Sequence, residues 1–209
     1  MVGAGVLQEC LEDARVTAVL AISRAPSGVS HAKLRERLHH DFFDFSALRA
    51  ELTGVDACFF CLGVSSAGLD EARYRRLTYD LTMAAATLLA ELNPGMTFCY
   101  VSGEGTDSTE QGRVMWARVK GRTENHLLRL RLSAYMFRPG FIRPLAGVSS
   151  KTAVYRLAYA VIGPLYPILK RIAPRHVTTS ENLARAMIAV AAGGSPKRIL
   201  ENQDINALA

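Results

Sequence analysis

The chain has 209 residues, of which 49% are hydrophobic and 21% charged, and 25 Lys and Arg against 19 Asp and Glu give a net charge of +6. This length and composition are typical of one globular domain with its own core. The positive charge suits an anionic ligand such as a phosphorylated cofactor. Because the basic residues are scattered and no recognition motif accompanies them, nucleic acid is excluded as the expected partner.

The first half of the chain alternates between helical and strand patterns. Apolar residues at helical spacing predict a helix at Gly5–Leu11, a short helix from Ser46 through Leu52, and a long helix at Glu71–Leu92 that stops at Asn93-Pro94-Gly95. Short apolar runs predict strands between them, at Val16–Ile22, Leu38–Phe42 and Val55–Leu62.

The second half continues the alternation. In chain order the patterns predict a strand at Met96–Ser102, a helix at Gly112–Leu130, a strand at Ala134–Arg138, helices at Lys151–Arg171 and Ser180–Ala191, and a last strand at Lys197–Glu201. Strands interleaved with helices of this size predict an α/β fold, a doubly wound parallel sheet of the Rossmann-like kind. We expect one domain over residues 1–209, with a small C-terminal lobe from about residue 145.

Targeting and membrane signals are weak. Acidic residues at positions 9, 12 and 13 interrupt any signal-peptide core. The apolar stretch 153–169 contains Arg156 and two prolines, so we expect it to pack within the lobe rather than to touch a membrane surface or a partner. A cytoplasmic location is the expectation.

The four cysteines lie in apolar settings, as reduced buried thiols do. Cys58 and Cys61 have the spacing of a metal or redox pair. Three residues apart on a strand, however, their side chains face opposite ways, and no second pair supports them. We therefore expect buried thiols and no metal site.

Ligands of a doubly wound sheet bind beyond the carboxyl ends of its strands. After the first strand stands Arg24, which favours NADP over NAD because an arginine there accommodates the extra phosphate; a solvated surface arginine is the alternative. Asp44 can accept a hydrogen bond from an adenine amine, or can simply favour a helix start. Gly63 and the small residues after it allow a ligand close to the backbone.

Two further pairs of residues carry chemistry. Tyr100 and Ser102 share one face of a strand, and Trp116 and Lys120 share one face of the following helix. The alternatives are core packing for Tyr100, and for Lys120 an exposed pairing with Glu124. Tyr79 is a further tyrosine whose expected role is core packing.

A serine at a strand end, followed by an aromatic residue and a lysine four positions later on a helix, resembles the short-chain dehydrogenase/reductase superfamily. More narrowly, the chain is similar to its atypical, epimerase-like members related to the human Tat-interacting reductase-like protein. The resemblance covers almost the whole chain and rests on Gly3 with its helix and on the segments 22–24, 44–45, 61–63, 119–121 with Glu124, 137–140 and 200–202.

The resemblance implies an NADP-binding Rossmann fold. It implies catalytic positions for Ser102, Trp116 and Lys120, and cofactor contacts for a larger set: Gly3, Arg24, Asp44, Phe45, Leu62, Gly63, Lys120 and Pro139. Lys120 would hold the nicotinamide ribose, and Ser102 would orient a substrate oxygen. A homo-oligomer stays open.

The chain departs from the superfamily at Trp116, which stands where those proteins have a tyrosine. A phenol can give and take a proton, whereas an indole N–H only donates a hydrogen bond. Reduction or oxidation of a small carbonyl or hydroxyl compound is therefore one hypothesis. A non-catalytic NADP-binding regulator or scaffold is the other.

The second departure is the glycine-rich turn, of which Gly3 matches only the last glycine. We expect a first strand and part of this turn to be missing, about ten residues in all. Because that strand would be central, its loss would leave unpaired buried backbone groups, each costing about 1–3 kcal/mol. We therefore expect the natural start to lie upstream, or a poorly folded product.

Overall fold

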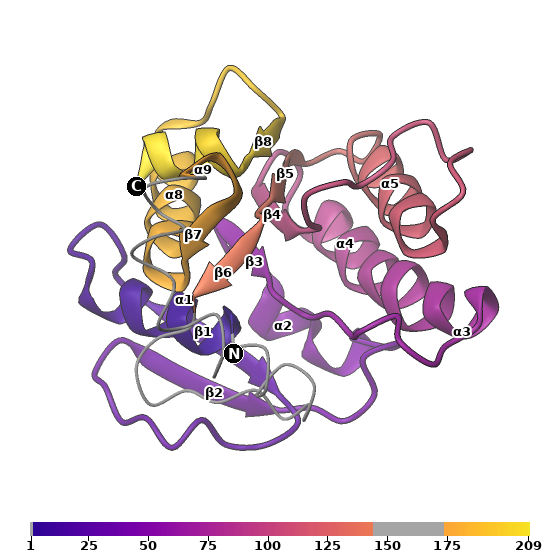
Figure 1. Cartoon of the computed structure of the whole chain (residues 1–209). Coiled ribbons are helices and arrows are strands. Elements are labelled where there is room, and N and C mark those ends of the chain that lie inside the picture. Colours follow the sequence, from indigo (N-terminus) through magenta and orange to yellow (C-terminus); the bar gives the residue numbers. More distant parts are fainter. Residues whose placement is uncertain (1, 144–173) are drawn as a thin grey trace. The chain divides into compact units, whose positions relative to one another are not determined.

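The computed structural model describes residues 2–143 and 174–209 (Figure 1). It divides into two compact units. Unit 1 comprises Met1–Leu38, Pro139–Gly194 and Leu200–Ala209, and unit 2 comprises His39–Arg138 and Ser195–Ile199.

Unit 2 is built on parallel strands. β3 (Ala57–Phe60) pairs with β4 (Thr97–Val101), and β4 pairs with β5 (Ser133–Arg138), with Val101 opposite Phe137. β8 (Ile199–Glu201) is hydrogen-bonded next to β5. The inner strands β4 and β5 are buried over most of their length because apolar side chains line both of their faces.

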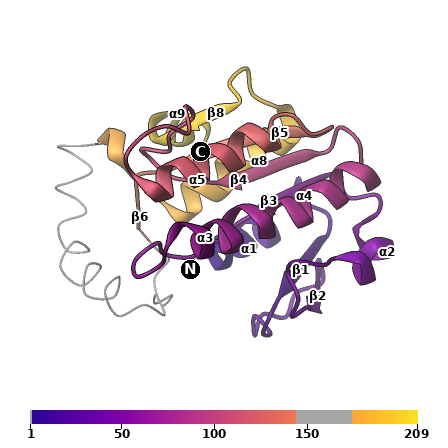
Figure 2. The same ribbon diagram turned by 90° about the vertical axis from the view of Figure 1, so that its right-hand side faces the viewer.

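Helices lie along this sheet. α3 (Glu71–Arg75), a π-helical turn η2 (Arg76–Asp80) and α4 (Leu81–Leu92) run on without a break, and α5 (Met115–Leu127) lies beside them (Figure 2). Asp70 caps the start of α3 by accepting a hydrogen bond from the Arg73 amide at 2.7 Å. Gly95, at φ 86°, lets the chain turn from α4 into β4. A short helical segment, η1 (Ser46–Leu48) followed by α2 (Arg49–Leu52), precedes β3.

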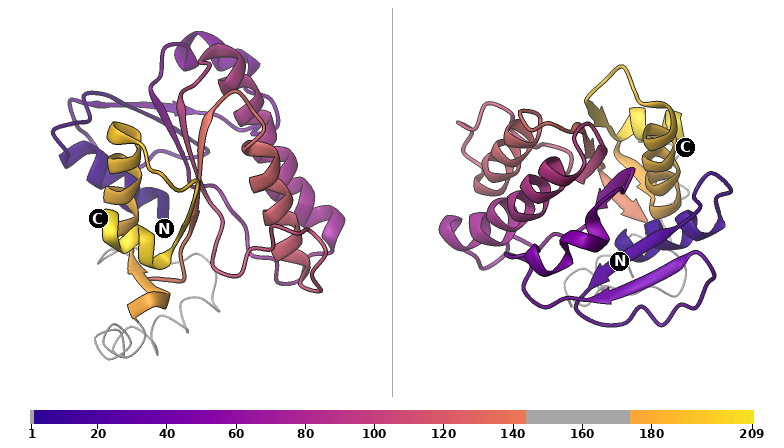
Figure 3. Two further views of the ribbon diagram at one scale, coloured as in Figure 1. Left: turned by 90° about the horizontal axis from the view of Figure 1, so that it is seen from above. Right: turned by 180° about the vertical axis from the view of Figure 1, so that it is seen from behind.

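Unit 1 contains α1 (Val2–Glu12) and two small parallel sheets. One consists of β1 (Val19–Ser23) and β2 (Leu34–Leu38), the other of β6 (Phe141–Arg143) and β7 (Val177–Thr179). α8 (Ser180–Gly193) packs on α1 and on α9 (Asn202–Leu208), and a short turn, η3 (Pro174–His176), leads into β7 (Figure 3).

Most expected elements are present with shifted ends. α1 begins at Val2 rather than Gly5, α5 is shorter than the expected Gly112–Leu130, and the expected helix Glu71–Leu92 contains the π turn. The sequence patterns do not predict β6, β7 or α9. The helix expected at Lys151–Arg171 lies outside the described residues. Among the helices that are described, none is long and apolar enough to cross a membrane.

The strand expected at Leu38–Phe42 is wrong. β2 lies earlier, where alternating charges in LRERL hide the strand pattern. The following residues turn instead, because Asp41 accepts a hydrogen bond from the Phe43 amide at 2.9 Å, and because the rings of Phe42 and Phe45 meet edge to face at 5.6 Å. Both rings are buried, which explains the apolar content of the segment without a strand.

Candidate functional site

A buried polar cluster lies where β4 and β5 end, in unit 2. Glu124, on α5, is fully buried, and its carboxylate accepts hydrogen bonds from Arg138 Nη2 at 2.5 Å and Arg138 Nε at 3.1 Å. The Ser102 hydroxyl donates to the same carboxylate at 2.5 Å, and Arg138 also donates to Ser108 Oγ at 2.5 Å. A buried charge pair with these extra hydrogen bonds is satisfied, so the cluster can hold its members rigidly.

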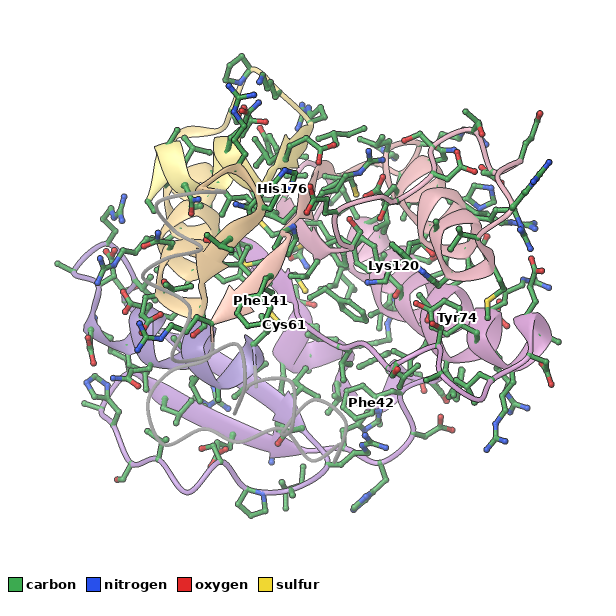
Figure 4. The ribbon with its side chains drawn as sticks, in the orientation of Figure 1. Phe42, Cys61, Tyr74, Lys120, Phe141 and His176 are labelled. Atoms are coloured by element: carbon green, nitrogen blue, oxygen red, sulfur yellow. The ribbon has the colours of Figure 1, made fainter. Side chains whose placement is uncertain are left out.

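Lys120 lies one helical turn before Glu124 and is partly buried (Figure 4). Its ammonium donates a hydrogen bond to the Ser102 carbonyl oxygen at the end of β4. Desolvation lowers the pKa of Lys120 to about 8, and the nearby Glu124 carboxylate opposes this shift. The structure therefore brings the Lys120 ammonium to the backbone of Ser102. It also excludes the alternative in which Lys120 pairs with an exposed Glu124.

The Ser102 hydroxyl already donates its hydrogen bond within the protein. It has one proton, which faces Glu124 Oε1 at 2.5 Å and the Phe137 carbonyl at 3.1 Å. The residue is 6% exposed. The Ser102 oxygen can still accept a hydrogen bond, but donation to a substrate carbonyl would require leaving Glu124.

Trp116, in the first turn of α5, is partly buried and lies against the loop after β4. A Cβ on Gly105 would sit 3.6 Å from the indole. The same loop is fixed to α5 by the hydrogen bond from the Asp107 amide to the Ala117 carbonyl at 3.1 Å. It also approaches Gly121 so closely that a Cβ there would be 1.7 Å from the Asp107 carbonyl oxygen. Trp116 and Lys120 therefore lie on a helix to which the loop is tightly fitted.

The segment that follows β3 is exposed at Leu62, Gly63 and Val64. Leu62 is 37% exposed and Val64 41%, and a Cβ on Gly63 would meet nothing within 4 Å. Because Gly63 has no side chain, a planar ring can approach its backbone and contact the exposed side chains of Leu62 and Val64. Cys61, at the start of this segment, is half-buried (Figure 4).

Asp44 and Phe45 have local roles. The Asp44 carboxylate is exposed and accepts a hydrogen bond from the Ser46 amide at 2.8 Å, a bond that holds its pKa below the usual value. Asp44 therefore supports the helix start, which is one of its two expected roles. Phe45 is buried, and its ring packs against His39 and Phe42.

Three other predicted cofactor residues lie in unit 1. Gly3 falls inside α1 and is exposed, whereas Gly5 is the buried glycine of that helix. Arg24 follows β1 and is exposed. Pro139 directly follows Arg138 at the end of β5.

Tyr100 and Tyr79 differ from the site residues. Tyr100 is 1% exposed, and burial raises its pKa well above that of a free phenol, so core packing is confirmed. The Tyr79 hydroxyl meets His126 Nδ1 at 2.5 Å between η2 and α5. Within the described residues, the Ser102 hydroxyl and the Lys120 ammonium are hydrogen-bonded to Glu124 and to backbone carbonyls, and not to the phenol of Tyr100 or Tyr79.

Glu124 and Arg138 are the site residues whose role the sequence does not show. The sequence indicates each of them only through the resemblance, and Glu124 also as a surface partner of Lys120. The available signal is the placement of Arg138 after five buried or half-buried residues of β5, where a charge needs a buried partner. Among the described residues, no cluster of three or more His, Cys, Asp or Glu is arranged to hold a metal ion.

The donor set at this edge fits a nicotinamide dinucleotide. Lys120 offers an ammonium that can hydrogen-bond ribose hydroxyls, and Leu62 and Val64 offer apolar contacts for a ring. Leu62 and Val64 follow the end of β3, and the Lys120 ammonium reaches from α5 to the end of β4. The carboxyl ends of parallel strands are where such ligands bind in this class of fold.

Comparison with solved structures supports the fold. The enzyme WbmF of Bordetella bronchiseptica, solved with NAD+, superposes with a TM-score of 0.68 at 17% identity over 99% of this chain and 73% of that one. DesIV of Streptomyces venezuelae, a dTDP-glucose 4,6-dehydratase solved with NAD, gives 0.67 at 16% identity over 99% and 76%. UDP-N-acetylglucosamine 4-epimerase of Bacillus cereus gives 0.65 at 13% over 99% and 79%.

The Rossmann-like α/β fold with parallel strands is therefore confirmed. No family model matches the sequence. Leucinostatins biosynthesis cluster protein T of Purpureocillium lilacinum is 28% identical over 133 residues, which are 62% of this chain. The match spans about half of that relative, 49% of its length.

Proposed function

We propose that the chain binds a nicotinamide dinucleotide at the carboxyl ends of β3 and β4 and uses it to transfer hydride to or from a small carbonyl or hydroxyl compound. The observation that carries this proposal is the fixed pair of Ser102 and Lys120 at the end of β4. Support comes from structural neighbours solved with NAD+ and NADH, one of them also with UDP.

Each residue has a defined part in this proposal. Lys120 binds the nicotinamide ribose through its ammonium, and Leu62 with Gly63 borders the ring. Ser102 orients a substrate hydroxyl by accepting its hydrogen bond, since its own proton is held by Glu124. Trp116 shapes the pocket through its contact with the loop at Gly105. The bound dinucleotide supplies or accepts the hydride.

Arg24 favours the phosphorylated dinucleotide, NADP, whereas the NAD-bound neighbours favour NAD. Titration calorimetry of the chain with NADPH and with NADH decides between them. We expect NADPH to bind more tightly, and Arg24→Gln to reduce this preference about tenfold, the worth of one charge-assisted hydrogen bond of ~1.5 kcal/mol. Arg35→Gln is the matched control, because Arg35 is an exposed arginine on the adjacent strand β2.

An unchanged preference in Arg24→Gln would show that Arg24 does not contact the phosphate. Binding of neither dinucleotide to the folded chain would refute the proposed site itself. Two further sets of contacts stay predictions: Asp44 and Phe45 with the adenine, and Gly3 and Pro139 with the rest of the dinucleotide. The same titrations, repeated on variants at these positions, test them.

A non-catalytic, NADP-binding regulator is the second candidate, and the observation that favours it is Trp116, which cannot release a proton. A panel of ketones, aldehydes and quinones with NADPH separates the two candidates. Turnover by the wild-type chain supports hydride transfer. Cofactor binding without turnover, together with turnover by Trp116→Tyr, supports a regulator with an otherwise intact site.

Two broader expectations stay predictions: a cytoplasmic location and a single domain over residues 1–209.

A further inference from the structure

Reduction of a carbonyl compound needs a proton as well as a hydride, and most groups near the end of β4 cannot give one. The indole of Trp116 does not titrate in water. The Ser102 hydroxyl donates to Glu124 at 2.5 Å, so its proton is already engaged. Tyr100 is 1% exposed, within the core.

Lys120 is placed differently. Its ammonium has three N–H groups, and the structure assigns one of them to the Ser102 carbonyl. This hydrogen bond holds the ammonium at the end of β4 and uses one of its three N–H groups. The lysine is partly buried, and burial desolvates its ammonium.

We propose that Lys120 is the proton donor for the reduction, an inference that rests on the proposed function. In this step the carbonyl carbon receives the hydride of the reduced dinucleotide. The carbonyl oxygen takes a proton from the Lys120 ammonium, so that an N–H bond breaks and an O–H bond forms. The neutral amine then takes a proton from water. Oxidation of an alcohol runs the same transfers in reverse.

Desolvation supports this role, because it lowers the pKa of Lys120 to about 8, where an ammonium both exists at neutral pH and releases its proton readily. The charged groups near Lys120 have opposite effects on its pKa. Glu124, on the same helix, raises the pKa, and Arg138, from β5, is bonded to that carboxylate and partly neutralises it. The phenol of Tyr100, from β4, is buried and interacts electrostatically with Glu124 and with Tyr74, from α3.

The first test measures the protonation of Lys120 without any substrate. The chain is briefly acetylated with acetic anhydride at a series of pH values, and the Lys120 peptide is quantified by mass spectrometry. We expect half-maximal reactivity near pH 8 in the folded chain, and near the ordinary lysine value of about 10.4 in the same peptide of the urea-unfolded chain. Identical profiles in both states would overturn the proposal.

The second test separates proton donation from cofactor binding. Lys120→Arg keeps a positive charge with several N–H donors but does not release a proton below about pH 12. We expect turnover in the carbonyl panel to fall at least ~100-fold at saturating NADPH, the usual contribution of a positioned acid, while calorimetry measures any change in NADPH binding separately. Lys33→Arg, in unit 1, is the control and should keep full turnover.

Undiminished turnover by Lys120→Arg would show that another group supplies the proton. The proposed function fails separately, if the wild-type chain binds no dinucleotide or if nothing in the panel is turned over. In that event the acetylation profile still decides whether Lys120 titrates near neutrality, and an ordinary lysine profile overturns the inference.

Discussion

At the scale of single residues, the fully buried carboxylate of Glu124 organises the site. It receives two hydrogen bonds from Arg138 and one from Ser102, and the carbonyl of Ser102 in turn anchors Lys120. Helical spacing places Lys120 and Glu124 on one face of α5. It cannot show that this face is buried at Glu124, because lysine and glutamate four residues apart usually form a solvated surface pair.

Removing one member of the buried Glu124–Arg138 pair should strongly destabilise the folded protein. We expect Arg138→Met to lower the free energy of unfolding by about 3–5 kcal/mol, because it leaves the Glu124 carboxylate buried and uncompensated. Urea denaturation followed by circular dichroism measures the loss. Arg49→Met, which breaks the exposed pair with Glu91, is the control and should cost less than ~1 kcal/mol.

The double variant Glu124→Leu with Arg138→Met sharpens this test. We expect it to recover much of the loss of Arg138→Met, because no buried charge is left without a partner. Equal effects of Arg138→Met and Arg49→Met would contradict the burial of Glu124 in the folded protein.

At the scale of elements, the sequence predicted the strands and helices of unit 2 best. β3, β4 and β5 are apolar runs bounded by polar turns, and such runs are easily recognised. The errors have physical causes. The charges of β2 hid a strand, and the aromatic residues after Leu38 suggested one, although Phe42 and Phe45 pack against each other in a turn.

The fit between α5 and the loop after β4 gives a prediction for Gly121. A Cβ at this position would lie 1.7 Å from the Asp107 carbonyl oxygen, so Gly121→Ala must push the loop away from the helix. We expect a loss of stability of about 1–3 kcal/mol, as in other overpacked sites, and weaker NADPH binding, because the same helix carries Lys120. Thermal unfolding and calorimetry measure the two effects.

Gly193→Ala is the matched control, since it is also a helical glycine but a Cβ there would meet nothing within 4 Å. It should be neutral or stabilising by up to ~1 kcal/mol. A Gly121→Ala protein as stable as Gly193→Ala would show that the loop is not held against α5 in solution.

At the scale of the whole molecule, the alternation of strands and helices predicted the Rossmann-like class, and structural neighbours of low sequence identity share it. The candidate site could be predicted only in part. Strand ends are readable from the sequence and pointed to Ser102, Gly63 and Arg24. The buried cluster of Ser102, Glu124 and Arg138 could not be predicted from the sequence, because its residues come from the end of β4, from α5 and from β5, which are far apart along the chain.

A crystal structure of the chain with NADP+ would locate the cofactor relative to Lys120 directly. We expect the nicotinamide ribose at the carboxyl end of β4, with a ribose hydroxyl at a hydrogen-bond distance of about 2.7–3.2 Å from Lys120 Nζ. A dinucleotide bound elsewhere, with no contact to Lys120, would contradict the proposed function and the role of this lysine.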